Sequence, residues 1–264
     1  MMIYIYDGTF EGLLTAICHG LRHNHAISDI TTFQRYQPDL FSKVVEIETV
    51  SDRARDFYRK LESLSKEMTA TVSYAFLSEQ PGMEMLIFDY LKTIFLHGTE
   101  MITNMNHPAI FRLYHLRRKV RHEIDRYHGF VRFRQLSNGI FYSPIEPDYN
   151  IVQFLAPHFT ARFADQCWMI HDILRETGIF YNLKQCVYLP RVPRDHPLVR
   201  PVLDPSKENA LAADVTELKY QHLWMRYFKE IAIMERHNPK VQRQQMPRRY
   251  WKHLIEEVDS SIRP

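Results

Sequence analysis

Three carboxylates and two imidazoles lie close together in the second half of the chain, and they are the residues best suited to chemistry. They are Glu146, Asp148, His158, His171 and Asp172. Such a set could bind a divalent metal ion or act as general acid and base. However, its spacing matches no zinc motif. The neighbours His171 and Asp172 would also point to opposite faces of a strand. A simpler, structural interpretation is that Asp148 caps a helix beginning near Asn150 and His171 is a packed, hydrogen-bonded sheet residue.

A second candidate site is the segment "MPRRYWKHL", residues 246–254. Arg248, Arg249 and Lys252 flank two aromatic residues, Tyr250 and Trp251. Aromatic rings stack on nucleic-acid bases, and cations follow the phosphate backbone. The alternative is that the rings pack on the protein core and only the cations face solvent. The sequence leaves both interpretations open.

Charge is distributed unevenly along a chain whose formal net charge is only +3. Residues 112–134 hold eight Lys and Arg against two carboxylates, and residues 219–253 hold nine against two. Residues 38–100 are acidic, with seven cations and eleven carboxylates. Basic blocks that contain aromatic residues are typical of phosphate-binding surfaces. We therefore predict that nucleic acid contacts Arg117, Arg118, Arg132, Arg134, Arg236, Arg243, Arg248, Arg249, Tyr250, Trp251 and Lys252.

Composition and motifs narrow the class of protein. The three cysteines form no CxxC pair, and the chain has no GxGxxG, Walker, GxSxG or HExxH motif. We therefore predict neither a metal nor a cofactor, and no reaction is named by a motif. No apolar run reaches the ~20 residues that span a bilayer, and the N-terminus lacks a signal-peptide pattern. We expect a cytoplasmic protein with no membrane partner.

The first 128 residues are predicted to be mostly helical, with a small β element. Residues 2–6 alternate as a strand, Asp7-Gly8 turns the chain, and Thr9 can cap a helix that follows from Phe10. A second strand is expected at residues 43–48, followed by four helices between Ser51 and Gly129.

Residues 129–264 are predicted to combine β-hairpins with helices. Hairpins at 130–145 and 167–189 flank a helix within 146–166, giving a ββαββ unit with one antiparallel sheet. A proline-rich loop, a long helix from Thr216 to Asn238 and the basic segment follow. The fold class is α+β, with 1–128 and 129–264 as two domains or as parts of one integrated domain.

Three stretches together carry a resemblance to a known family: "YDGTFEGLL" (residues 6–14), "APHFTARFADQCWMIHD" (residues 156–172) and "ERHNPKVQRQQMPRRYWKHL" (residues 235–254). The chain resembles bacterial DNA metabolism proteins encoded beside a radical-SAM protein of DNA modification or repair. It is also similar to the N-terminal part of fused proteins that continue into a uracil-DNA glycosylase-like domain. The resemblance implies a role in DNA repair or modification. It assigns no catalytic residues, and radical chemistry would belong to the partner, since this chain lacks CxxxCxxC.

Three functions follow as expectations. The first is a non-catalytic, DNA-binding accessory protein that acts with a radical-SAM partner. The second is an enzyme acting on nucleic acid through the Glu/Asp/His set. The third is a protein-interaction module in which "MPRRYWKHL" is buried.

Overall fold

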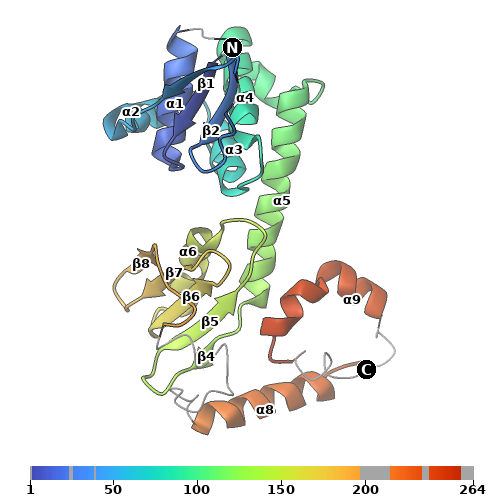
Figure 1. The fold of residues 1–264 in the computed structure, drawn as a ribbon. Helices are drawn as coiled ribbons and strands as arrows, with labels where there is room; N and C mark the ends of the chain where they lie inside the picture. The colour runs from blue at the N-terminus through green and yellow to red at the C-terminus, as the bar shows by residue number, and fades with distance from the viewer. Residues whose placement is uncertain (1, 24–25, 39, 197–214, 234–237, 257–264) are drawn as a thin grey trace. The chain divides into compact units, whose positions relative to one another are not determined.

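The structure is a computed structural model, and it describes residues 2–23, 26–38, 40–196, 215–233 and 238–256. The chain divides into two compact units, residues 1–121 (unit 1) and 122–264 (unit 2). The division falls inside helix α5 (Pro108–Phe130), whereas the sequence placed a boundary at residue 128. Each unit is described by itself, and Figure 1 shows the elements of both.

Unit 1 contains a three-stranded parallel sheet. Its strands are β1 (Met2–Tyr6), β2 (Ile27–Thr32) and β3 (Lys43–Glu46), in the order β2-β1-β3. The predicted strands at 2–6 and 43–48 are confirmed, and β2 is an addition. The helix α1 (Phe10–His23) connects β1 to β2, as a parallel pair requires. Thr9 caps this helix as predicted, because its Oγ1 accepts a hydrogen bond of 2.9 Å from Gly12 N.

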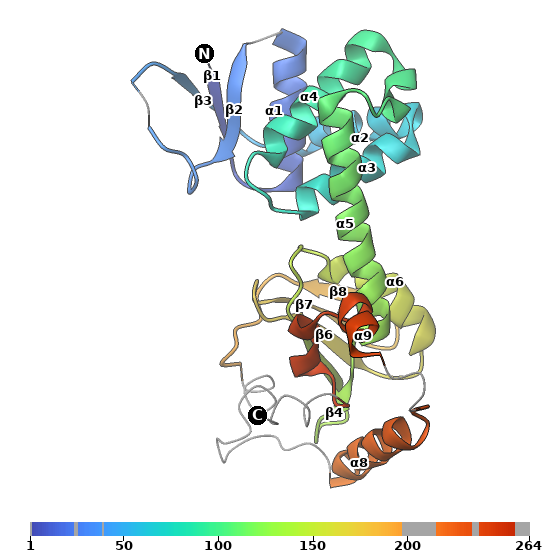
Figure 2. The same ribbon diagram turned by 90° about the vertical axis from the view of Figure 1, so that its right-hand side faces the viewer.

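Helices cover one face of this sheet, and five helical segments besides α1 lie among the described residues of unit 1. They are α2 (Ser51–Leu64), α3 (Lys66–Leu77), α4 (Met83–His97), the 3-10 helix η1 (Thr99–Thr103) and the first part of α5. Tyr4 and Tyr6 project from β1 into the core, where the Tyr4 hydroxyl lies 3.1 Å from His19 Nδ1 and the Tyr6 hydroxyl donates to Glu84 at 3.2 Å. The face that presents Tyr4 and Tyr6 is therefore covered by α1 and α4, which Figure 2 shows beside the sheet.

Unit 2 is built on a five-stranded sheet. Its strands are β4 (Arg134–Gln135), β5 (Phe141–Ile145), β6 (Trp168–Asp172), β7 (Thr177–Tyr181) and β8 (Cys186–Leu189), in chain order across the sheet. The β4–β5 and β6–β7 hairpins are confirmed. The prediction of an all-antiparallel ββαββ sheet is wrong in two details. β5 and β6 run parallel, because the helix α6 (Val152–Arg162) crosses between them. A turn at Asn182–Gln185 also divides the last predicted strand into β7 and β8.

The C-terminal part of unit 2 contains α8 (Val215–Glu230), α9 (Pro239–Gln245) and the 3-10 helix η3 (Arg248–His253). α8 ends at Glu230, eight residues before the predicted end of the long helix. The overall class is α+β, as predicted. Within the described ranges, none of the helices combines the length and the apolar character needed to cross a bilayer.

Candidate nucleic-acid interface

The segment 246–254 folds onto unit 2 through its tyrosine. Tyr250 is buried, and its ring packs against Tyr127 and Phe130 of α5 at centroid distances of 5.2 and 5.1 Å. Leu254 is also fully buried. Trp251 is half-buried, and its indole Nε1 donates a 2.9 Å hydrogen bond to the Met246 carbonyl. Of the two predicted stacking rings, Tyr250 therefore faces the core.

Glu123 of α5 is the group that holds this segment. Its carboxylate is 2% exposed and accepts hydrogen bonds from Asp148 N and Tyr149 N, each at 3.0 Å. It also accepts from the Tyr250 hydroxyl and from Arg249 Nη2, each at 3.2 Å. Burial raises the pKa of Glu123, and the hydrogen bonds from Asp148 and Tyr149 oppose that rise. A buried carboxylate with four donors is a structural anchor.

The cations of the segment pair with the predicted catalytic carboxylates. Arg249 forms an ion pair with Asp148, and Lys252 forms one with Glu146. His253 Nε2 lies 3.2 Å from the same Glu146 carboxylate. Burial acts to raise the pKa of Glu146, but Lys252 and His253 lower it below its ordinary value. The cations predicted to bind nucleic acid and the carboxylates predicted to be catalytic thus neutralise each other's charge in the folded chain.

Arg248 is an exposed cation of the segment. Its guanidinium lies 5.7 Å from the centre of the Trp251 ring, and it makes no ion pair with any described residue. Arg243 donates to the Pro239 carbonyl of its own helix at 3.0 Å. These two arginines of unit 2 keep their charge available to an outside anion.

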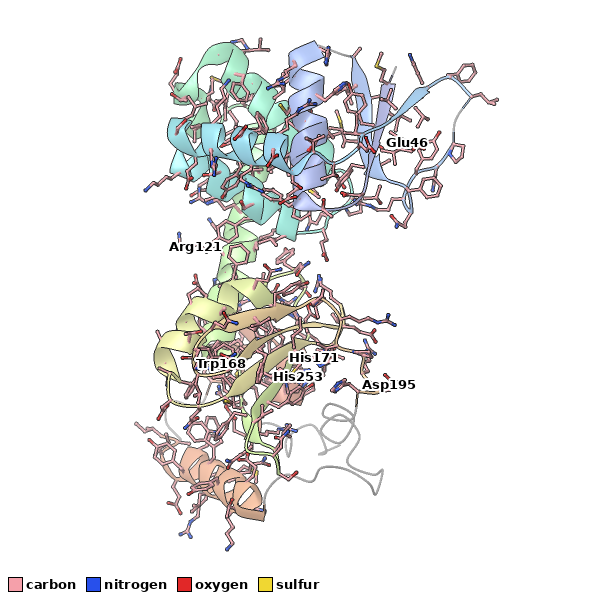
Figure 3. The ribbon with its side chains drawn as sticks, turned by 90° about the vertical axis from the view of Figure 1, so that its left-hand side faces the viewer. Glu46, Arg121, Trp168, His171, Asp195 and His253 are labelled. Atoms are coloured by element: carbon pink, nitrogen blue, oxygen red, sulfur yellow. The ribbon has the colours of Figure 1, made fainter. Side chains whose placement is uncertain are left out.

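The rest of the Glu/Asp/His set occupies separate environments. His171 is fully buried on β6, three positions after Trp168 on the same strand (Figure 3), and its Nδ1 lies 2.8 Å from the Tyr142 hydroxyl, which confirms the structural interpretation of this residue. Asp172 accepts from Leu174 N and Arg175 N and pairs with the Arg175 side chain. His158 stacks on His128 with ring centres 4.2 Å apart.

Two further results concern the same set. Asp148 does not cap α6, because the N-cap is Ile151 and no side-chain cap bond forms there. Across the described residues, no three His, Cys, Asp or Glu side chains converge in a way that could hold a metal ion.

The other predicted nucleic-acid contacts are distributed over both units. In unit 1, Arg117 pairs with Glu67 at 2.9 Å, and Arg118 is exposed. In unit 2, Arg132 pairs with Glu256 at 2.6 Å, while burial lowers the pKa of the largely enclosed Arg134. Arg236 lies outside the described residues.

A groove in unit 2 combines aromatic rings with arginines. Its volume is about 1040 Å³, and it runs between the end of α5, the β4–β5 edge, the end of α6 and α8. The aromatic and cationic residues that line it are Phe133, Phe141, Tyr220, Trp224, Tyr227, Arg132 and Arg162. The rings of α8 are accessible, with Tyr220 67% and Tyr227 54% exposed. Rings that solvent reaches beside guanidinium groups can stack on unpaired bases.

Trp224 is held in place at the centre of this groove. Its Nε1 donates to Glu256 at 3.0 Å, and the Arg132 guanidinium lies 5.8 Å from the centre of its ring. Burial acts to raise the pKa of Glu256, but the hydrogen bond from Arg132 lowers it below its ordinary value. The carboxylate is therefore charged and orients both the tryptophan and the arginine. Sequence reasoning missed Trp224 and Tyr220, although their i, i+4 spacing on a helix was visible.

Comparison with known families now assigns the chain. Residues 81–256 match the family described as domain of unknown function DUF4130. The matched range includes α4, α5 and nearly all of unit 2. The match covers more than half of the chain, so the protein belongs to this family. A search of curated proteins finds no match to the chain.

Proposed function

We propose that this chain is a non-catalytic accessory protein that binds DNA through the groove of unit 2. The observation that carries the proposal is the line of accessible rings, Tyr220, Trp224 and Tyr227, beside Arg132 and Arg162. Stacking requires unpaired bases, so the bound form would be single-stranded or locally opened DNA. Arg243 and Arg248 would add attraction at longer range.

The biological setting rests on the family resemblance. In this proposal the chain works in DNA repair or modification, and it presents DNA to a radical-SAM protein encoded beside it. It would correspond to the N-terminal part of fused glycosylase-like proteins. The alternative of an enzyme has less support, because Glu146 and Asp148 are ion-paired and His171 is enclosed in the sheet.

Trp224→Ala is expected to weaken binding of a single-stranded oligonucleotide about tenfold, since one base–aromatic stack is worth about 1–3 kcal/mol. Trp224→Phe keeps a ring, so its affinity for the oligonucleotide should lie between those of the unmodified chain and Trp224→Ala. Phe228→Ala is the matched control, because Phe228 is a partly exposed ring of the same helix that does not line the groove. Fluorescence anisotropy measures all four proteins. If Trp224→Ala and Phe228→Ala bind DNA equally well, the groove is not the site.

The salt dependence of the same binding separates stacking from phosphate contact. Because Arg249 and Lys252 are already paired, we expect few phosphates to be neutralised. The slope of log K against log salt should therefore be shallow, about −0.7 for each phosphate contacted on a single strand. Arg162→Gln should make the slope shallower by about one contact. Arg226→Gln, which removes an exposed cation of α8 outside the groove, should not change it.

A second candidate function is the docking of a partner protein on α8. Leu223 is 61% and Ile231 54% exposed, and aliphatic side chains do not stack on bases. A partner that covers this face would compete with DNA, so adding the purified radical-SAM protein to the anisotropy assay distinguishes a shared surface from a separate one.

A further inference from the structure

Three helices of unit 1 line a cavity that is separate from the proposed DNA groove. Its volume is about 730 Å³, which is in the range of small-molecule sites. It lies between the end of α1, the start of α2 and the second half of α4. Cys18 and Leu21 of α1 form part of its wall.

Phenylalanine rings supply flat apolar walls. Phe57 and Phe88 are buried, and Phe95 stacks with Phe57 at a centroid distance of 6.2 Å and an interplanar angle of 28°. The ammonium groups of two lysines lie over these rings, Lys60 5.5 Å from the Phe95 centre and Lys92 6.0 Å from the Phe88 centre. Phe57 and Phe88 are covered, so Phe95, which is 37% exposed, is the ring of the three against which a flat ligand can stack.

Positive charge predominates around the cavity. Arg22, Arg53, Lys60 and Lys92 line it, against two carboxylates, those of Asp52 and Asp56. Each of these carboxylates has an exposed arginine of its own helix nearby, at 3.8 and 3.6 Å. The ligand that complements this lining therefore carries negative charge as well as a flat ring.

The start of α2 adds to this preference for an anion. Val50 is the N-cap of this 14-residue helix, and it lines the cavity together with Asp52 and Arg53 of the first turn. Valine has no side-chain acceptor, and no side-chain cap bond forms there. The positive end of the α2 dipole therefore adds to the attraction for an anionic group, and the Asp52 carboxylate in the first turn offsets part of it.

We propose that this cavity is a binding site for a mononucleotide, with the base against the phenylalanine rings and the phosphate held by Lys60, Lys92 and the neighbouring arginines. The site is independent of the DNA groove, because all of its residues belong to unit 1. Its volume of about 730 Å³ suits one nucleotide, whereas the groove of unit 2 is larger, at about 1040 Å³.

Isothermal titration of the full chain tests this site with AMP as the probe. We expect saturable binding of one AMP per chain. Adenosine lacks the phosphate and ribose 5-phosphate lacks the base, so each should bind at least about tenfold more weakly. Octanoate, an aliphatic anion, should not displace AMP. The site is not a nucleotide site if AMP shows no saturable binding, if adenosine binds as tightly as AMP, or if octanoate displaces AMP.

Lysine variants locate the binding. Lys60→Ala and Lys92→Ala should each raise the Kd for AMP about tenfold, the effect of one charged hydrogen bond. Lys66→Ala is the matched control, because Lys66 is an exposed lysine of unit 1 that does not line the cavity. Equal Kd values for Lys60→Ala and Lys66→Ala would place AMP elsewhere. Trp224→Ala should retain AMP binding, so failure of the DNA proposal and failure of this one are separable.

Discussion

Glu123→Ala is expected to lower the free energy of unfolding by about 3–5 kcal/mol, the usual result when one partner of a buried polar cluster is removed. The variant leaves the amides of Asp148 and Tyr149 and the hydroxyl of Tyr250 without their acceptor. These neutral donors account for most of the loss. The contribution of Arg249 is smaller, because its side chain is 42% exposed and solvent screens its charge.

Urea unfolding followed by circular dichroism measures this loss. Glu123→Gln keeps one acceptor oxygen in the same volume and should be intermediate. Asp125→Ala removes an exposed carboxylate from the same helix and should change stability by less than about 0.5 kcal/mol. Limited trypsin digestion gives a second measurement. Loss of the anchor should make the peptide bonds after Arg248, Arg249 and Lys252 accessible to the protease. If Glu123→Ala unfolds at the same urea concentration as the unmodified chain, Glu123 does not anchor the segment.

Local patterns predicted most of the elements of the fold. The helix α5 could be placed from Pro108 and Gly129, because proline is favoured at a helix start and glycine near its end. The strand β2 was missed because "ISDITT" is short and polar, and it becomes a strand only by pairing with β1. The parallel pairing of β5 and β6 was also missed, since strand direction depends on the crossover through α6.

The candidate sites were harder to predict, because their chemistry depends on contacts between distant residues. Lys252 and Glu146 are 106 positions apart, and Arg249 and Asp148 are 101 apart. A single sequence shows these four charged side chains but cannot show that they pair. The burial of Tyr250 likewise depends on Tyr127 and Phe130, which α5 places beneath it. The aromatic groove was missed for the same reason, as its rings come from Phe133 between α5 and β4, from β5 and from α8.

These contacts change the meaning of "MPRRYWKHL". Its most characteristic residues, Arg249, Tyr250 and Lys252, contact Glu123, Asp148 and Glu146 of the same unit. Such contacts stabilise the fold of unit 2 whether or not the segment contacts a ligand. Its presence in a sequence therefore identifies this fold more directly than it identifies DNA binding.

His171 makes the stability of unit 2 depend on pH. Burial lowers its pKa from the ordinary 6.5 to about 4, and a hydrogen bond with the Val192 backbone and the charge of Glu176 oppose that shift. Arg194 and His196 add to the lowering. The folded chain keeps the imidazole neutral, whereas the unfolded chain takes up a proton below about pH 6.5. The free energy of unfolding is therefore at its full value above pH 6.5 and decreases as the pH drops toward 4.

The expected loss from His171 is about 2 kcal/mol at pH 5 and about 3 kcal/mol at pH 4, from 1.36 kcal/mol for each unit of pKa difference. His171→Asn puts an amide near the position of Nδ1 and removes the titrating ring. The variant should be less stable than the unmodified chain at pH 7. Its free energy of unfolding should, however, decrease less between pH 7 and pH 5. Some slope should remain, since burial also lowers the pKa of His128. Tyr142→Phe is the control, because it removes the hydroxyl partner at 2.8 Å and keeps the buried imidazole, so its pH slope should persist. Urea unfolding at a series of pH values measures each slope, and equal slopes for His171→Asn and the unmodified chain would assign the acid sensitivity to other groups.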